Sequence, residues 1–165
     1  MKKIILILAI VAISTVQAKT QGVKGNTGIS IGAEVGAPVG TAGISDYYSL
    51  VVGGSIQAEH LVSPDFGLTL KAGYLHYLAK AAGLGAGFIP VLAGFRYHFS
   101  PMVYASGQLG ASFSTLSGSG ISFSYAPGVG FMFAHHIDVL ARYEAASKSG
   151  LTFGNIGVRM AYNFN

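Results

Sequence analysis

The chain has 165 residues, no cysteine, 24 glycines and charged side chains at only 10% of its positions. A soluble domain usually carries about 25% charged residues, and a chain without cysteine has no disulfide, thiolate nucleophile or thiolate metal site. No run of lysine or arginine is interleaved with aromatic side chains, so we expect no nucleic acid as a partner.

Residues 1–18 have the pattern of a secretory signal peptide. Two lysines precede an apolar run over residues 4–13, and Val16-Gln17-Ala18 places small residues where a signal peptidase needs them. The run is too short to cross a bilayer as a helix. We predict cleavage after residue 18, a short periplasmic segment over residues 19–27 and one domain over residues 28–165. Without the two leader lysines, eight basic residues remain against six acidic ones, a net charge of about +2.

The remainder contains eight segments in which every second residue is apolar, the period of a strand with one apolar face. They cover residues 29–38, 50–62, 66–77, 88–99, 103–114, 121–133, 137–146 and 153–164. The connectors cover residues 39–49, 63–65, 78–87, 100–102, 115–120, 134–136 and 147–152, so that three-residue turns alternate with longer loops. Short periplasmic turns, longer outside loops and an even strand number are typical of a bacterial outer-membrane barrel. We therefore predict an all-β fold, an eight-stranded antiparallel up-and-down transmembrane β-barrel.

The turns provide an independent check of the alternation, because residues paired across an antiparallel hairpin point to the same face. Three-residue turns would pair Val62 with Phe66, Phe99 with Val103, and Phe133 with Ile137, which all belong to the apolar face. The predicted register and the hydrophobic pattern therefore agree.

The other face distinguishes a membrane barrel from a soluble one, which alternates in the same way. That face carries mostly glycine, serine and alanine, together with four acidic and four basic residues: Glu34, Glu59, Lys71, Arg96, Asp138, Arg142, Glu144 and Arg159. The wet exterior of a soluble barrel would need many more charges. Small residues around a few balanced charges suit the narrow interior of an eight-stranded barrel, with the apolar face toward lipid.

Aromatic residues gather near the two ends of the predicted strands, as in interfacial belts. One belt contains Tyr97, Phe99, Phe131, Phe133, Tyr162 and Phe164; the other contains Tyr47, Tyr48, Tyr74, Phe88, Phe113, Phe123 and Tyr125.

The chain resembles the small eight-stranded outer-membrane proteins that include the OmpA transmembrane domain and OmpX-like proteins. The resemblance rests on "ISIGAEVGAPVG", "GFIPVLAGFRYHFSPMVYASGQLGASF", "IDVLARYE" and the closing "NIGVRMAYNF". It implies that Tyr162 and Phe164 form the terminal signal read by the barrel-assembly machinery, although Asn165 follows the phenylalanine. The family includes adhesins, enzymes, stress-response proteins and pores, so it implies an architecture and no single activity.

Catalytic and metal sites find little support. His98 and Ser100 are similar to the His-x-Ser pair of lipid A deacylases, but the predicted topology places His98 inside the barrel at its periplasmic end. His135 and His136 adjoin Asp138 in a turn, yet only one of the two can face inward with it. His60 and His76 fall on the lipid-facing register. We predict no catalytic, cofactor-binding or metal residue.

The interior charges allow two interpretations, a structural ion-pair network or a path for ions. In either, Glu59 could reach Lys71 diagonally, because Gln57 would lie opposite Lys71.

The first functional hypothesis is a monomeric, structural or surface-interaction protein in contact with outer-membrane lipid and lipopolysaccharide. Loops 39–49 and 78–87 would then bind any surface ligand. The alternatives are a narrow, low-conductance pore and, third, a lipid-modifying enzyme.

Overall fold

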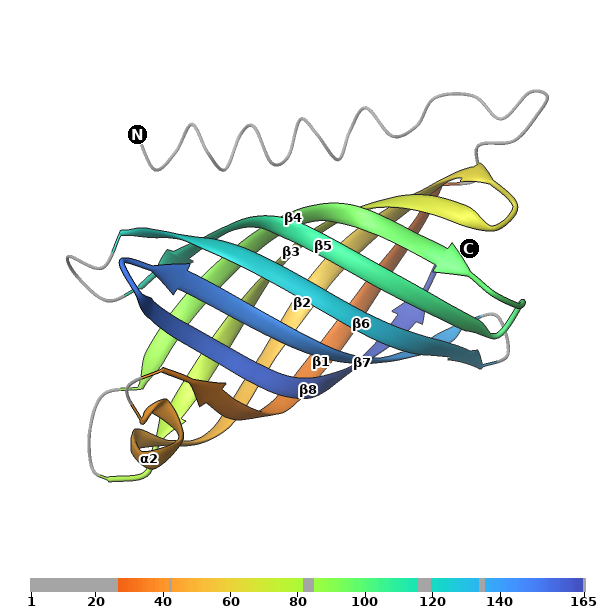
Figure 1. Ribbon diagram of the computed structural model, residues 1–165. Helices are drawn as coiled ribbons and strands as arrows, with labels where there is room; N and C mark the ends of the chain where they lie inside the picture. Colours follow the sequence, from red (N-terminus) through yellow and green to blue (C-terminus); the bar gives the residue numbers. More distant parts are fainter. Residues whose placement is uncertain (1–26, 42, 82–84, 116–119, 134–135, 165) are drawn as a thin grey trace.

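The computed structural model describes residues 27–41, 43–81, 85–115, 120–133 and 136–164. Eight antiparallel strands form one closed barrel, in which each strand pairs with its neighbours in the chain and β8 returns to pair with β1 (Figure 1). This confirms the predicted all-β, eight-stranded, up-and-down fold. The predicted signal peptide lies outside the described residues.

The strands are 12 to 16 residues long, so most of them extend beyond the predicted segments. Their bounds are β1 Thr27–Gly40, β2 Tyr48–Ser63, β3 Phe66–Ala79, β4 Ala86–His98, β5 Val103–Ser114, β6 Ile121–Phe133, β7 Ile137–Lys148 and β8 Leu151–Asn163, and one short helix, α2, covers Ile44–Tyr47 between β1 and β2. No helix among the described residues is long and apolar enough to cross a membrane.

The two ends of the barrel differ in their connections. The turn end, on the right in Figure 1, contains the β2–β3, β4–β5 and β6–β7 connections, the start of β1 and the end of β8. The loop end contains the other four connections and α2. The terminal strands β1 and β8 therefore begin and finish at the same end of the barrel.

One predicted loop is absent. The connector predicted over residues 147–152 is wrong, because β7 continues to Lys148 and β8 already begins at Leu151, which pairs with it. Ser149 and Gly150 form a two-residue turn with φ angles of 49° and 84°. Positive φ at both central residues is the geometry that joins two twisted strands most tightly.

Two of the three predicted hairpin pairs are confirmed. Phe133 lies opposite Ile137, and the N–H of Phe99 donates to the carbonyl of Val103 at 2.9 Å.

The third predicted pair, Val62 with Phe66, is wrong. The register shifts between Leu61 and Ser63, so that Ser63 lies opposite Phe66. This irregularity absorbs one residue close to the turn. Deeper in the hairpin, Gln57 lies opposite Lys71 as predicted.

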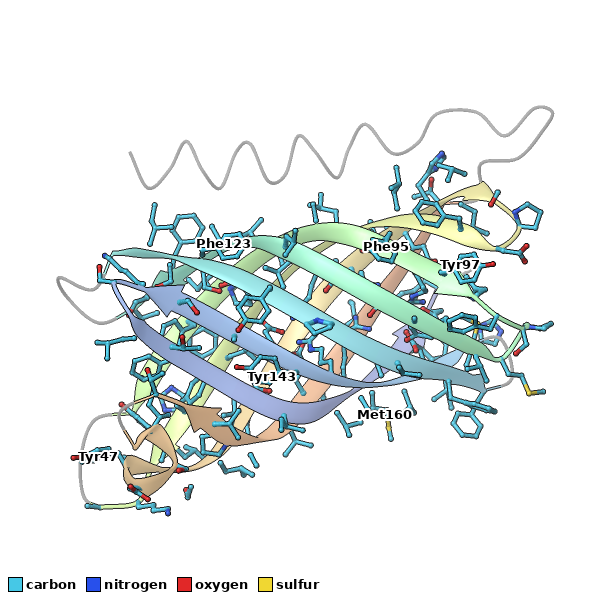
Figure 2. All side chains as sticks on the ribbon, viewed as in Figure 1. Tyr47, Phe95, Tyr97, Phe123, Tyr143 and Met160 are labelled. Atoms are coloured by element: carbon cyan, nitrogen blue, oxygen red, sulfur yellow. The ribbon has the colours of Figure 1, made fainter. Side chains whose placement is uncertain are left out.

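The outer face of the barrel is mainly apolar, and side chains such as Met160 project from the wall (Figure 2). Large exposed residues come from all strands and include Ile31, Ile56, Leu70, Phe95, Leu109, Val129, Ile137 and Ile156. An apolar surface this extensive is stable in lipid and not in water. The closed sheet also satisfies its backbone polar groups internally, as a hydrocarbon environment demands.

The predicted aromatic belts are correct except at the loop end. Phe113 and Phe123 are exposed on the outer face there. Tyr48 and Phe88, in contrast, turn inward and pack together with Phe153. The prediction failed at these two positions because an aromatic residue at a strand end suits either a lipid interface or the barrel interior.

Replacing Val158 with Arg tests the outward assignment. Val158 lies near the middle of β8 and is 40% exposed, so a lipid-facing charge there should lower the free energy of unfolding by about 2–4 kcal/mol. Urea titrations of refolded protein in lipid vesicles would measure the difference. Val158→Leu is the apolar control, and an Arg variant as stable as this control would mean that the faces are reversed.

Candidate functional site

The interior of the barrel is the part of the fold where charged groups converge, and at the turn end it opens into a hollow of about 790 Å³. Glu59 and His98 line this hollow, with 3.2 Å between the Glu59 carboxylate and His98 Nε2. We call this hollow the vestibule. Beneath it, Arg96 donates to Glu59 and to Asp138, both at 2.9 Å. Arg96 therefore connects the partly exposed carboxylate of Glu59 to the fully buried carboxylate of Asp138.

Asp138 is held by three groups from three different strands. Besides Arg96, the hydroxyl of Tyr104 donates to it, and Arg159 Nη1 lies 3.9 Å from it. The Arg96 guanidinium also lies over the Tyr104 ring, 4.0 Å from the ring centre. A cation against an aromatic face and a carboxylate with several donors are both compatible with complete burial.

A second cluster occupies the middle of the interior. Lys71 Nζ lies 2.7 Å from Glu144 and 3.5 Å from Glu34, and Arg142 bonds to both carboxylates. Two cations and two anions thus alternate around a ring formed by β1, β3 and β7.

Arg159 joins the two clusters, because it lies 3.9 Å from Glu34 as well as from Asp138. It also donates to the hydroxyls of Ser55 and Ser30, at 2.9 and 3.1 Å. The structure therefore places all eight charges singled out in the sequence within one connected interior network. The suggested Glu59–Lys71 pair is wrong, because Arg96 reaches Glu59 while Lys71 points toward Glu34 and Glu144.

Uncharged polar side chains fill further interior space. Gln108 donates to Gln57 and to Thr69, both at 3.1 Å, and Ser124 donates to Ser112 at 2.7 Å. The two Gln108 contacts cross the interior, because β5 pairs with neither β2 nor β3, whereas the Ser124–Ser112 contact joins the neighbouring strands β5 and β6. Hydrogen bonds between uncharged side chains therefore span the barrel interior.

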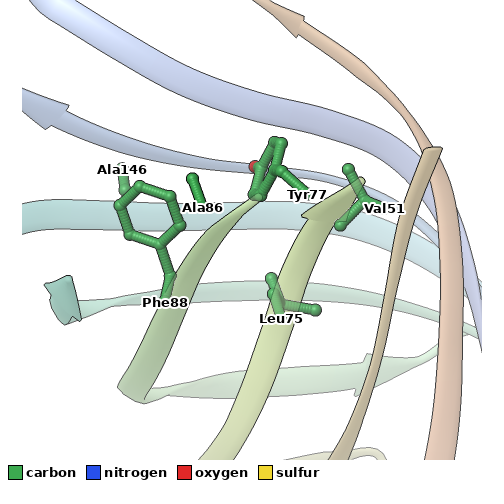
Figure 3. Packing of buried hydrophobic residues seen from close by; sticks show 6 residues of the cluster. All are labelled: Val51, Leu75, Tyr77, Ala86, Phe88 and Ala146. Carbon is green, nitrogen blue, oxygen red and sulfur yellow. The ribbon is translucent and has the colours of Figure 1, made fainter. Parts of the chain in front are cut away.

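The loop end of the interior is closed by an apolar cluster that the sequence analysis missed, and we call it the plug. Figure 3 shows its buried part, which consists of Val51, Leu75, Tyr77, Ala86, Phe88 and Ala146. Tyr48 and Phe153 pack against it, and the rings of Tyr77, Phe88 and Phe153 lie 5.2 to 5.9 Å apart. The available signal was the run of large apolar residues on the inward register at one end of several strands.

His98 and Ser100 contact different residues. The His98 ring contacts Glu59 and lies beside Tyr104, whereas the Ser100 hydroxyl accepts from the backbone N–H groups of Met102 and Val103. Each side chain thus has a local structural partner.

The other described histidines, His60, His76 and His136, have separate partners. His60 contacts the hydroxyl of Thr27 at 2.8 Å on the outer face, and His76 contacts Tyr74. His136 stacks on Tyr162 near the end of β8, while His135 lies outside the described residues. Within the described part of the chain, no three His, Asp or Glu residues converge in a way that could hold a metal ion.

Comparison with known proteins shows the family to which this chain belongs. The family profile described as "Outer membrane protein beta-barrel domain" matches residues 5–164, and the chain belongs to this family. It is therefore a small β-barrel of the bacterial outer membrane. No curated protein sequence matches the chain.

Solved structures show the same fold at low sequence identity. Ail, the attachment invasion locus protein of Yersinia pestis, has a TM-score of 0.62 at 19% identity, over 86% of this chain and 100% of Ail. The outer-membrane enzyme PagL has a TM-score of 0.58 at 15% sequence identity, over 82% of this chain and 99% of PagL. The N-terminal barrel of OprF from Pseudomonas aeruginosa has a TM-score of 0.54 at 16% sequence identity, over 86% of this chain and 100% of that domain.

Replacing Gly130 with Ala tests the packing around Tyr104. A Cβ at this position would lie 2.0 Å from the Tyr104 ring, which is also held by Arg96 and Asp138 and so has little room to move. We expect a loss of about 1–3 kcal/mol in unfolding free energy. Gly54→Ala is the matched control, because its nearest contact would be an ordinary 3.5 Å. Equal stability of the two variants in a urea titration would contradict this packing.

Replacing Arg142 with Met tests how tightly the central cluster is coupled. The change leaves the buried carboxylates of Glu34 and Glu144 to share fewer cations, and loss of one partner of a buried ion pair costs about 3–5 kcal/mol. The double variant Arg142→Met, Glu144→Gln removes one charge of each sign and should recover part of that loss. The temperature at which the folded band disappears on a gel would report both effects. An unchanged midpoint for the single variant would contradict tight coupling.

Proposed function

We propose that this protein is a closed, non-conducting barrel with a structural or surface-interaction role, and that its loop end faces the outside of the cell. The orientation is supported by the connections. Bacterial outer-membrane barrels have short periplasmic turns and longer outside loops, and the strands β1 and β8 begin and finish at the turn end here. Both chain termini would then be periplasmic.

The observation that carries the proposal is the double closure of the interior. The ion-pair network crosses the middle of the barrel, and the plug lies between it and the loop end. An ion entering from the vestibule would have to break paired charges and then pass an apolar layer in which it has no partner, which is costly. The interior charges would then pair with one another and fill the barrel without providing a path for ions.

A catalytic role has little support. His98 and Ser100 have separate structural partners, and the fold itself assigns no activity, since similar structures include a protein named for attachment and an outer-membrane enzyme. We propose that the protein is not an enzyme and needs no cofactor.

The proposed partners follow from the faces of the barrel. Outer-membrane lipid and lipopolysaccharide would contact the apolar outer face. The barrel-assembly machinery would read Tyr162 and Phe164, whose side chains are both exposed near the end of β8. Any surface ligand would meet loops 39–49 and 78–87, and the protein would act as a monomer.

Single-channel recording of the refolded mature protein in a planar bilayer tests this proposal against the pore alternative. We expect a silent bilayer from protein that a heat-modifiability gel shows to be folded. Reproducible conductance steps that disappear in Glu59→Gln would overturn the proposal and establish a pore entered from the vestibule. Steps that persist in this variant would also overturn it, by a path that avoids the Glu59 carboxylate.

A further inference from the structure

A second hollow, of about 440 Å³, opens at the loop end beside α2. We call it the crater. Its apolar lining includes Ile44 of α2, Tyr48 of β2, and Leu151 and Phe153 of β8. Tyr48 and Phe153 also pack on the plug, so the plug forms the floor of the crater. Its size and lining are those of small-molecule pockets, which are mostly apolar with a few polar groups.

Two polar contacts hold the walls of the crater in place. Thr41, which follows β1, accepts a hydrogen bond at its hydroxyl from the N–H of Thr152 at 2.8 Å. The N–H of Lys80, beyond β3, donates to the carbonyl of Tyr47 at 2.9 Å. The first contact ties the segment after β1 to β8, and the second ties the last residue of α2 to the segment after β3. A pocket that is already ordered loses little conformational freedom when a ligand binds.

The crater also contains two opposite charges, Asp46 and Lys80. No salt bridge joins them or connects either to another described residue. A ligand with an ammonium group and an anionic group would pair with both charges, whereas a singly charged ligand would leave one unpaired. The lining residues Ala79, Leu151 and Phe153 lie on the inward register of their strands, so the lipids around the barrel are separated from the crater by its wall.

We infer that the crater binds a zwitterionic amphiphile with a single short alkyl chain that enters from the aqueous side. The chain lies between Ile44, Leu151 and Phe153 above the plug, and the head group lies between Asp46 and Lys80. This inference rests on the proposed role of the loop end as the interacting surface. Binding by purified protein does not depend on the orientation or on the absence of conductance, so the two proposals can fail separately.

The chain has no tryptophan, which makes a single introduced tryptophan an unambiguous reporter. Tyr48→Trp places it on the crater floor. Tyr74→Trp is the matched control, because Tyr74 is 44% exposed on the outer face near the same end. Both variants would be studied in detergent-free lipid nanodiscs, with folding checked by gel mobility. The probe is a short-chain phosphocholine with a brominated acyl chain, which quenches tryptophan on contact.

We expect saturable quenching of Tyr48→Trp and only weak, linear quenching of Tyr74→Trp, which reports the probe dissolved in the bilayer. Parallel curves for the two reporters would overturn the inference. If Tyr48→Trp does not fold, Leu151→Trp takes its place, since that residue is half exposed at the mouth of the crater.

Two further variants in the reporter background test the ligand class. Ala79→Phe should fill the crater and remove the saturable component. Lys80→Ala should weaken the apparent affinity about fivefold, because the loss of an exposed charged contact has a modest effect. Asp65→Asn, which changes a carboxylate in the β2–β3 turn, is the control and should leave binding unchanged. Saturation that survives Ala79→Phe would place the probe elsewhere and overturn the inference.

Discussion

The barrel wall has no free edge, because β8 returns to pair with β1, and in lipid this closure is obligatory for a sheet. Once eight strands close, the interior is only wide enough for side chains to fill it. The apolar face must then point outward, and the charges on the opposite face of the strands are brought together in a narrow interior. The buried ion pairs are thus a consequence of closure. They are not strong evidence for either stability or conduction.

The eight strands and the direction of their faces could be predicted from the sequence because period two is a local property, visible within ten residues. Connector lengths were less reliable. The turn at Ser149 and Gly150 depends on positive φ angles that a serine rarely adopts, and the shift near Val62 depends on how the turn packs. Neither feature changes the hydrophobic pattern, so no periodicity could reveal it.

For the interior, the sequence predicted which charges point inward but not which charges meet. Lys71 and Glu144 lie 73 residues apart and touch at 2.7 Å, because β3 and β7 face each other across the barrel. Such pairing depends on the diameter and stagger of the whole sheet, whereas the cross-strand rule applies only to neighbouring strands. The Glu59–Lys71 pair was suggested from that rule. In the structure, Lys71 instead contacts Glu144 on the opposite side of the barrel, and Glu59 contacts Arg96.

The interior of the barrel is filled in two different ways, by ion pairs toward the turn end and by the apolar plug at the loop end. At the turn end, the Glu59 carboxylate pairs with Arg96 and borders the open vestibule together with His98. At the loop end, Tyr77 and Phe88 replace charges with tightly packed aromatic rings. An apolar floor at that end cannot attract ions, but it can bind hydrocarbon. The apolar residues that disfavour a pore therefore also favour binding of an apolar group in the crater. The loops around the crater would then determine which ligand binds.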